Sequence, residues 1–210
     1  MPARVYVSQH PLVRHKQTTL RQSATDPAAF RALVRQLSQL LFFEATADLR
    51  LEDFTVPTPL ANYAGQRVAE RVGLLPILRA GLGMAEPVLD LLPTAQVWHL
   101  GLYRDHQTLK PITYYNKLPA RTTLDVAFVL DPMLATGGSA VAALDILKGW
   151  GLKRLKFLAL IAAPEGVEAL RQAHPDVPIF LAALDSHLNA DKYIVPGLGD
   201  AGDRQFGTTT

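Results

Sequence analysis

Hydrophobic residues recur at helical spacing in the first part of the chain. Asp26 and Pro27 supply a capping residue and a proline suited to a first helical turn. The apolar residues that follow predict an amphipathic helix. They are Phe30, Leu33, Val34, Leu37, Leu40 and Leu41.

From residue 73 onward the pattern changes to short apolar runs separated by helix-like stretches of crossover length. The runs are typical of buried parallel strands and cover residues 74–78, 97–103, 126–130, 155–162 and 179–184. The helix-like stretches cover residues 84–92, 139–148 and 166–173. This alternation predicts right-handed β-α-β units and therefore an α/β fold with a doubly wound, mainly parallel sheet and flanking helices.

Two stretches rich in turn-forming and polar residues do not fit the alternation. Residues 104–123 are expected to form a two-stranded arm or flap that closes over a site. Residues 187–210 form a glycine-rich tail without a helical period. Because no linker or repeat separates these parts, we expect one domain over residues 1–210.

Composition narrows the classes of function. The 210 residues are 49% hydrophobic and carry 21 basic and 19 acidic side chains, a formal charge of +2 that gives little reason to expect nucleic acid as a partner. The absence of cysteine excludes disulfides, thiolate metal sites and a cysteine nucleophile. Because no apolar run is long enough for a signal sequence or a membrane span, we expect a cytoplasmic protein without a membrane partner.

One strand-to-helix junction carries candidate phosphate chemistry. The strand that begins at Asp125 ends at the carboxylate of Asp131, and Thr136-Gly137-Gly138-Ser139 leads into the next helix. Backbone N–H groups and the positive end of the helix dipole would converge there, and the Thr and Ser hydroxyls add donors. An ordinary turn with an N-cap remains an equal alternative from these residues alone. Neither a Walker loop nor a dinucleotide fingerprint is present.

The longer string VLDPMLATGGSA resembles the phosphoribosyl pyrophosphate (PRPP) loop of phosphoribosyltransferases, in the form found in uracil phosphoribosyltransferases, where a proline (here Pro132) replaces the second acid. The resemblance extends over almost the whole chain. It is carried by HPLVRHK near the start, FEATADL, PILRAGLGM, GLYRD, AAPEG and YIVPGLGDAGDRQFGT.

The resemblance implies a type I phosphoribosyltransferase fold with a C-terminal hood, and an enzyme that converts uracil and PRPP to UMP and diphosphate in pyrimidine salvage. An RNA-binding regulator built on the same fold is the alternative from another class. Such a regulator would be expected to have a concentrated basic face. Purine or orotate enzymes would not be expected to carry YIVPGLGDAGD.

The site residues follow from the same resemblance. Arg79, Arg104 and Asp200 are expected to be catalytic, the two arginines because a guanidinium suits a diphosphate leaving group that gains charge. The expected PRPP-binding residues are Arg79, Arg104, Asp131, Pro132, Met133, Leu134, Ala135, Thr136, Gly137, Gly138, Ser139 and Asp200. The expected uracil-binding residues are Ile194, Gly199, Asp200 and Ala201, which would read the base through the backbone.

Other polar residues receive a structural interpretation. Lys110 and Lys117 are expected to be solvated, Asp203 to be structural, and Glu44 with Asp48 to form a charged helix end. The six histidines lack metal-ligand spacing, so the expected cofactor, Mg²⁺, would be held mainly through the substrate. The resemblance also implies a homodimer or larger homo-oligomer and, as in some relatives, GTP as an effector.

Overall fold

The computed structural model describes residues 4–104 and 111–208. Its centre is a sheet in which the strand order is β1-β11-β10-β8-β4-β6-β7. The strands of this path are β1 (Val5–Val7), β4 (Val72–Leu78), β6 (Leu100–Arg104), β7 (Pro111–Asn116), β8 (Val126–Leu130), β10 (Leu155–Ala162) and β11 (Ile179–Leu184). All neighbouring pairs are parallel except β6 with β7. The predicted α/β class and mainly parallel sheet are therefore confirmed.

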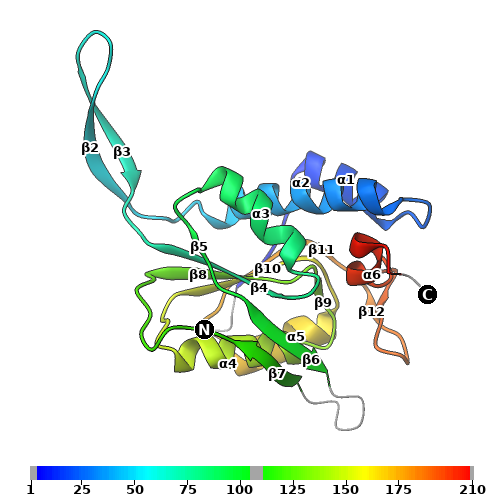
Figure 1. The fold of residues 1–210 in the computed structure, drawn as a ribbon. Coiled ribbons are helices and arrows are strands. Elements are labelled where there is room, and N and C mark those ends of the chain that lie inside the picture. The colour runs from blue at the N-terminus through cyan, green and yellow to red at the C-terminus, as the bar shows by residue number, and fades with distance from the viewer. Residues whose placement is uncertain (1–3, 105–110, 209–210) are drawn as a thin grey trace.

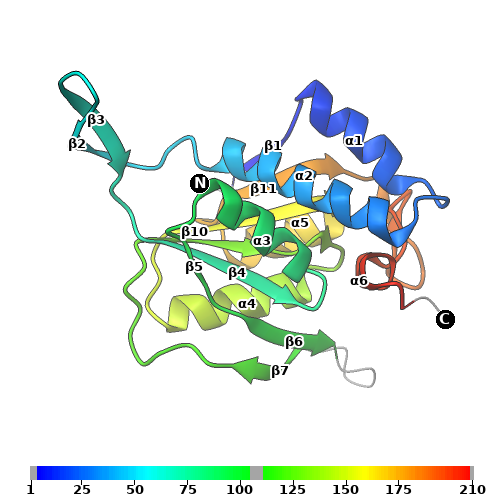
Figure 2. The same cartoon turned by 45° about the horizontal axis from the view of Figure 1, so that its top comes forward.

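Helices cover both faces of the sheet (Figures 1 and 2). One face carries α1 (Pro11–Arg21), α2 (Pro27–Ala45) and α3 (Leu82–Leu91), and the other carries α4 (Gly138–Gly149) and α5 (Pro164–Ala173). Successive strand residues point to opposite faces, so each strand contributes to two separate cores. Leu74 and Phe128 pack in the core that contains Leu37 of α2, while their chain neighbours pack in the core beneath α4.

The predicted elements agree with most of these bounds. The three strands over residues 126–130, 155–162 and 179–184 match β8, β10 and β11. The predicted strand over 97–103 was wrong in detail, because the chain forms β5 (Gln96–Val97) and, after a break, β6. At the break the Trp98 N–H donates to Leu74 O at 2.9 Å.

The tail is more regular than its sequence suggested. It contains the antiparallel pair β12 (His187–Leu188) and β13 (Ile194–Val195) and then α6 (Ala201–Phe206). The sequence shows no helical period in the tail because the six residues of α6 are too few to form one. In the region predicted as an arm, β7 pairs with β6, while residues 105–110 and Lys110 among them lie outside the described residues.

A different hairpin, which the sequence analysis did not predict, projects from the body. It consists of β2 (Leu51–Pro57) and β3 (Asn62–Val68), and we call it the projecting arm (Figures 1 and 2). Most of its residues are exposed on both faces, so the arm lacks the buried periodic pattern that identified the other strands. Within the described residues, no helix is long and apolar enough to cross a membrane.

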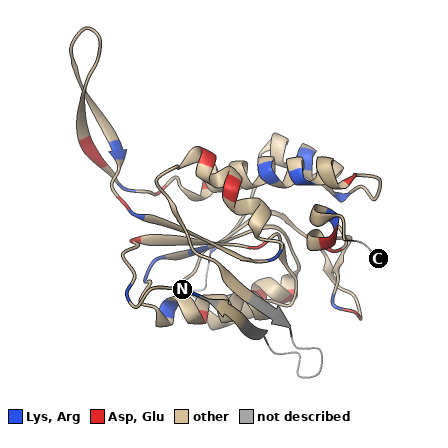
Figure 3. Ribbon diagram, viewed as in Figure 1, with Lys and Arg blue, Asp and Glu red and all other residues tan. Residues whose placement is uncertain are grey.

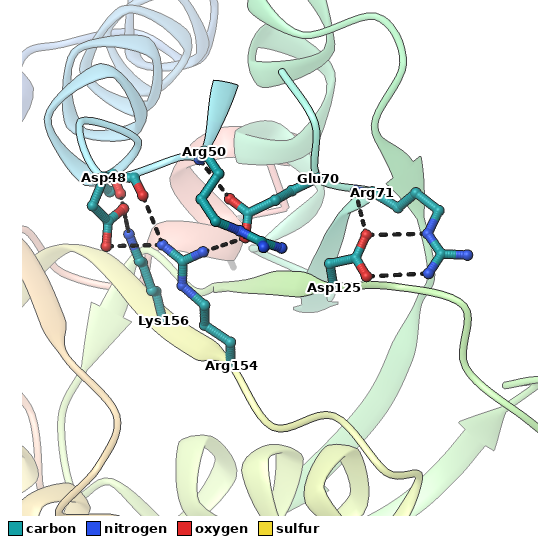
Figure 4. Close-up of polar contacts among 8 residues, drawn as sticks. Asp48, Arg50, Glu70, Arg71, Asp125, Arg154 and Lys156 are labelled. Atoms are coloured by element: carbon teal, nitrogen blue, oxygen red, sulfur yellow. Dashed lines mark hydrogen bonds and ion pairs between the residues drawn. The ribbon is translucent and has the colours of Figure 1, made fainter. Parts of the chain in front are cut away.

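An ion-pair network holds the base of the projecting arm (Figure 4). Glu70, whose side chain is 1% exposed, accepts hydrogen bonds from the backbone N–H of Arg50 at 2.9 Å and from the Arg154 guanidinium. Arg154 also pairs with Asp48 at 3.0 Å, and Asp48 pairs with the buried ammonium group of Lys156. The network therefore ties both chain ends of the arm to the start of β10. Asp48 thus has a structural role in this network.

Candidate active site

The loop predicted to bind phosphate, residues 131–139 and here called the phosphate loop, lies between the end of β8 and the start of α4. It includes the short strand β9 (Met133–Leu134), which pairs with β10, and it encloses a pocket of about 80 Å³. The pocket is lined by Asp131, Met133, Leu134, Ala135, Thr136, Gly137, Gly138, Ser139 and Ala140. Pro132 does not line it. Its carbonyl accepts the Leu160 and Ile161 N–H groups at 3.0 and 3.1 Å and so secures the loop to β10.

Glycines permit this loop geometry. Gly137 stands before α4 with φ of 83°, a conformation that strains residues with a Cβ. Gly166 of α5 lies against the loop, and a Cβ there would be 2.3 Å from Ala135 O. No side chain of the described residues caps α4. Its first N–H groups therefore face the pocket without an internal partner, an arrangement that suits a phosphate.

Asp131 supplies the carboxyl group among the residues that line this pocket. Burial raises the pKa of Asp131 to about 7, and the backbone N–H of Met133, at 3.4 Å, offsets the rise only weakly. With so few partners, the ionised form of this carboxyl group is destabilised by burial. A hydroxyl donor or a cation bound beside it would reduce that destabilisation.

The loop after β4 carries Arg79 next to the phosphate loop. Gly81 is required there, because a Cβ would lie 2.4 Å from Leu130 O, directly before Asp131. The Arg79 side chain is 63% exposed, and its acidic partner among the described residues, Asp203, is 4.0 Å away. Arg79 is therefore available to an anionic ligand. Arg104 ends β6, a neighbour of β4, but its side chain lies outside the described residues.

The tail reaches the same edge of the sheet. Asp200 caps α6 by accepting the Asp203 N–H at 2.9 Å, which leaves its second carboxylate oxygen free of this contact. Gly197 and Gly199 have φ of 63° and 79°, so the backbone turns sharply beside the predicted base-reading residues. Of these residues, Ile194 and Ala201 are buried.

Three charged residues that sequence reasoning missed hold the tail in place. Arg21 pairs with Asp185 at 2.6 Å and also donates to Gly197 O at 2.9 Å. The Arg204 guanidinium donates to Leu198 O at 2.9 Å and to Gln22 O at 2.6 Å. Asp185 directly follows β11 at the carboxyl edge of the sheet, so the signal that identified Asp131 could have found it. The two arginines gave no comparable signal.

The structure therefore brings together Arg79, the phosphate loop and the tail at the carboxyl ends of parallel strands, where doubly wound folds bind ligands. This arrangement defines the type I phosphoribosyltransferase class. The structure of a protein from Aquifex aeolicus matches it with a TM-score of 0.92 at 36% identity, covering 98% of this chain and 99% of that one. A hypoxanthine phosphoribosyltransferase from Staphylococcus aureus, with a TM-score of 0.53 at 8% identity over 86% of this chain and 84% of its own, shares the fold.

The sequence relatives identify the family within this class. The family model described as uracil phosphoribosyltransferase matches residues 7–208. Uracil phosphoribosyltransferases of Roseiflexus sp. (strain RS-1) and Geobacillus kaustophilus are 69% and 54% identical to the chain, each covering 98% of it and 99% of the relative. The chain belongs to the uracil phosphoribosyltransferase family. These relatives support the transferase hypothesis and not the RNA-binding alternative.

Proposed function

We propose that the chain transfers the phosphoribosyl group of PRPP to N1 of uracil, giving UMP and diphosphate in the cytoplasm. The observation that carries this proposal is the convergence of a phosphate pocket, an exposed arginine and a glycine-rich tail at one edge of the sheet. The distribution of charge is consistent with small anionic substrates. Lys and Arg positions occur on the arm, on the helices and at strand ends instead of on a single face (Figure 3).

Each part of the site has a distinct task in this proposal. The N–H groups of the phosphate loop, with Thr136 and Ser139, bind the 5′-phosphate, and Asp131 faces the ribose hydroxyls. Arg79 and Arg104 bind the diphosphate, whose charge grows as its bond to the ribose breaks. The backbone around Gly199 and Ala201, with Ile194, reads the edge of uracil, and cytosine would leave polar groups unpaired there. Holding both reactants in place can supply roughly 7–11 kcal/mol of the barrier.

Mg²⁺ fits this site as an ion that arrives with PRPP. Within the described residues no three His, Asp or Glu side chains form a cluster that could hold a metal. Mg²⁺ commonly keeps its waters and uses substrate phosphates, with one or two protein carboxylates. We propose that Asp131 supplies the protein carboxylate near the ribose. The bound ion would supply positive charge to the leaving diphosphate.

The projecting arm supports a homodimer or larger homo-oligomer. Large apolar side chains along the arm are exposed, from 42% at Phe54 to 97% at Leu60. An apolar hollow of about 360 Å³ opens at its base, between Phe43, Leu51 and Leu91. An isolated two-stranded hairpin is at best marginally stable, so a second copy of the chain would stabilise it.

The assay that tests the function measures diphosphate release with Mg²⁺ and PRPP, offering uracil, cytosine, orotate and hypoxanthine in separate reactions. Turnover is expected with uracil alone. A parallel series with GTP tests the effector that the family resemblance implies. If uracil gave no turnover with or without GTP, the proposed function would be wrong.

A further inference from the structure

The short helix α6 packs against the loop that carries Arg79. Its buried face consists of Ala201, Gly202 and Gln205, spaced so that they share one side of the helix. Gly202 lies close to the loop, since a Cβ there would be 3.9 Å from that of Ala80. Asp203 of the same helix is the acidic residue 4.0 Å from Arg79. The base-binding tail and the diphosphate-binding loop therefore share one contact surface.

Gln205 is the polar centre of that surface. Its side chain is 1% exposed, and its Nε2 donates to Ala80 O at 3.2 Å. Its Oε1 lies against Gly83, where a Cβ would be only 2.2 Å away, and it has no hydrogen-bond partner among the described residues. The carboxamide therefore spans the segment from Ala80 to Gly83, which begins directly after Arg79.

The backbone of Gln205 is fixed independently of this contact. Its carbonyl accepts a hydrogen bond from Arg31 of α2 at 2.9 Å. At the other end of the helix, Asp200 provides the N-cap. A shift of the Arg79 loop would therefore act on α6 through the side chain of Gln205, and α6 begins at two of the proposed uracil-reading residues, Asp200 and Ala201.

We propose that Gln205 is a positioning residue that couples the diphosphate and uracil subsites. The proposal rests on the proposed function. A ligand that fixes the loop at Arg79 also favours the α6 position that receives uracil, and uracil favours the loop position in return. Such a coupling must be reciprocal, so each ligand changes the affinity of the other by the same factor.

The test measures binding of Mg²⁺-diphosphate to the full chain by calorimetry, with and without saturating uracil. In the unaltered protein uracil is expected to tighten diphosphate binding. Gln205→Leu keeps the volume and removes the hydrogen bond to Ala80. The coupling factor is the ratio of the diphosphate affinities measured with and without uracil. The substitution is expected to reduce this factor roughly threefold to tenfold, as the loss of one buried hydrogen bond allows. The effect of diphosphate on uracil binding should fall by the same factor.

Gln17→Leu is the matched control. Gln17 is 5% exposed, donates to Leu160 O at 2.7 Å and also has an Oε1 without a partner, but it contacts strand β10 instead of the Arg79 loop. Its loss should lower the melting temperature and leave the coupling factor unchanged. Equal coupling factors in Gln205→Leu and the unaltered protein would overturn the proposal.

Gly83→Ala is a second variant if Gln205→Leu does not fold. Alanine is favoured over glycine within α3, yet its Cβ would displace the Gln205 carboxamide, so coupling should fall while the helix stays stable. An unchanged coupling factor in this variant would also contradict the proposal. Because the titrations need no turnover, they are separate from the assay of function. An inactive protein that still showed the coupling would contradict only the proposed function.

Discussion

Two aspartates of the site differ in what holds them. Asp200 caps a helix and is exposed, so its charge is well solvated. Asp131 is half-buried with one long backbone contact, and its pKa is raised to about 7. Both aspartates directly precede a turn or a helix in the sequence. The difference in their electrostatics therefore comes from the residues that surround each of them in the fold.

We predict that Asp131→Asn stabilises the free protein at alkaline pH while it lowers activity. Because the pKa of Asp131 is raised above its ordinary value of 3.8, the folded state holds a proton that the unfolded state releases. Stability therefore falls as the pH rises from about 4 to about 7, and the variant escapes this loss. Its gain over the unaltered protein should reach on the order of 2–4 kcal/mol at pH 8. Denaturant unfolding at pH 4 and pH 8 measures the difference, and a gain independent of pH would contradict it.

We predict that Asp200→Asn loses activity and stays folded. Asparagine is as good an N-cap as aspartate, so α6 should persist, while the charge near the phosphoribosyl group disappears. A fall in kcat of roughly 10²–10³ is expected, as for removal of one transition-state contact.

The control for this variant is Asp26→Asn, which makes the same exchange at the cap of α2, where Asp26 accepts the Ala29 N–H at 2.8 Å. It should retain the kcat of the unaltered protein. Similar losses in both variants would show that capping, and not the charge in the site, determines the effect.

At the scale of elements, the network in Figure 4 fixes where the projecting arm leaves the body. Burial opposes ionisation of Glu70, but hydrogen bonds from Arg50 and Arg154 outweigh it and lower its pKa. The stabilisation is therefore present above the ordinary pKa of Glu70, 4.5, and is lost as the pH falls through its lower folded value.

We predict that Glu70→Gln lowers the free energy of unfolding by about 1–3 kcal/mol at pH 7, because Arg154 loses a buried charged partner. Hydrogen exchange of the arm amides should increase, since the arm is less firmly held at its base. Glu52→Gln breaks the exposed pair with Arg67 on the arm itself and should cost less than about 1 kcal/mol. An equal cost for the two variants would contradict the role of the network.

At the scale of the whole molecule, the projecting arm extends away from the body, in which the sheet lies between two layers of helices (Figure 2). Among the described residues, Leu60 is left 97% exposed and Tyr63 61% exposed. Stable association commonly buries about 800 Å² on each partner, to which such an arm would contribute.

We predict that Leu60→Asp weakens self-association at least about tenfold, because a charged carboxylate cannot be buried unpaired at an interface. Sedimentation velocity over a range of concentrations measures the change. Leu12→Asp introduces the same charge on α1 at a residue that is 51% exposed and should leave association unchanged. A chain that is monomeric before substitution would contradict the proposed homo-oligomer.

Much of the fold could be predicted because burial leaves periodic patterns. The strands β8, β10 and β11 are continuous apolar runs, and α2 combines a cap with an apolar stripe. The projecting arm could not be found this way, since its residues pack on no core and alternate with no buried face. The helix α6 was missed because it is shorter than two turns.

The sequence by itself determined the α/β class and, through its resemblance, the family, and it indicated the strand-to-helix loop after Asp131 as a candidate phosphate site. Those features depend on short sequence motifs and on the periodicity of hydrophobic residues, both of which can be read directly from the sequence. The tertiary structure decided that Gln205 meets Ala80 and that Arg21 and Asp185 hold the turn at Gly197. These contacts join residues more than a hundred positions apart or across different elements, so they depend on how the layers pack and leave no local pattern in the sequence.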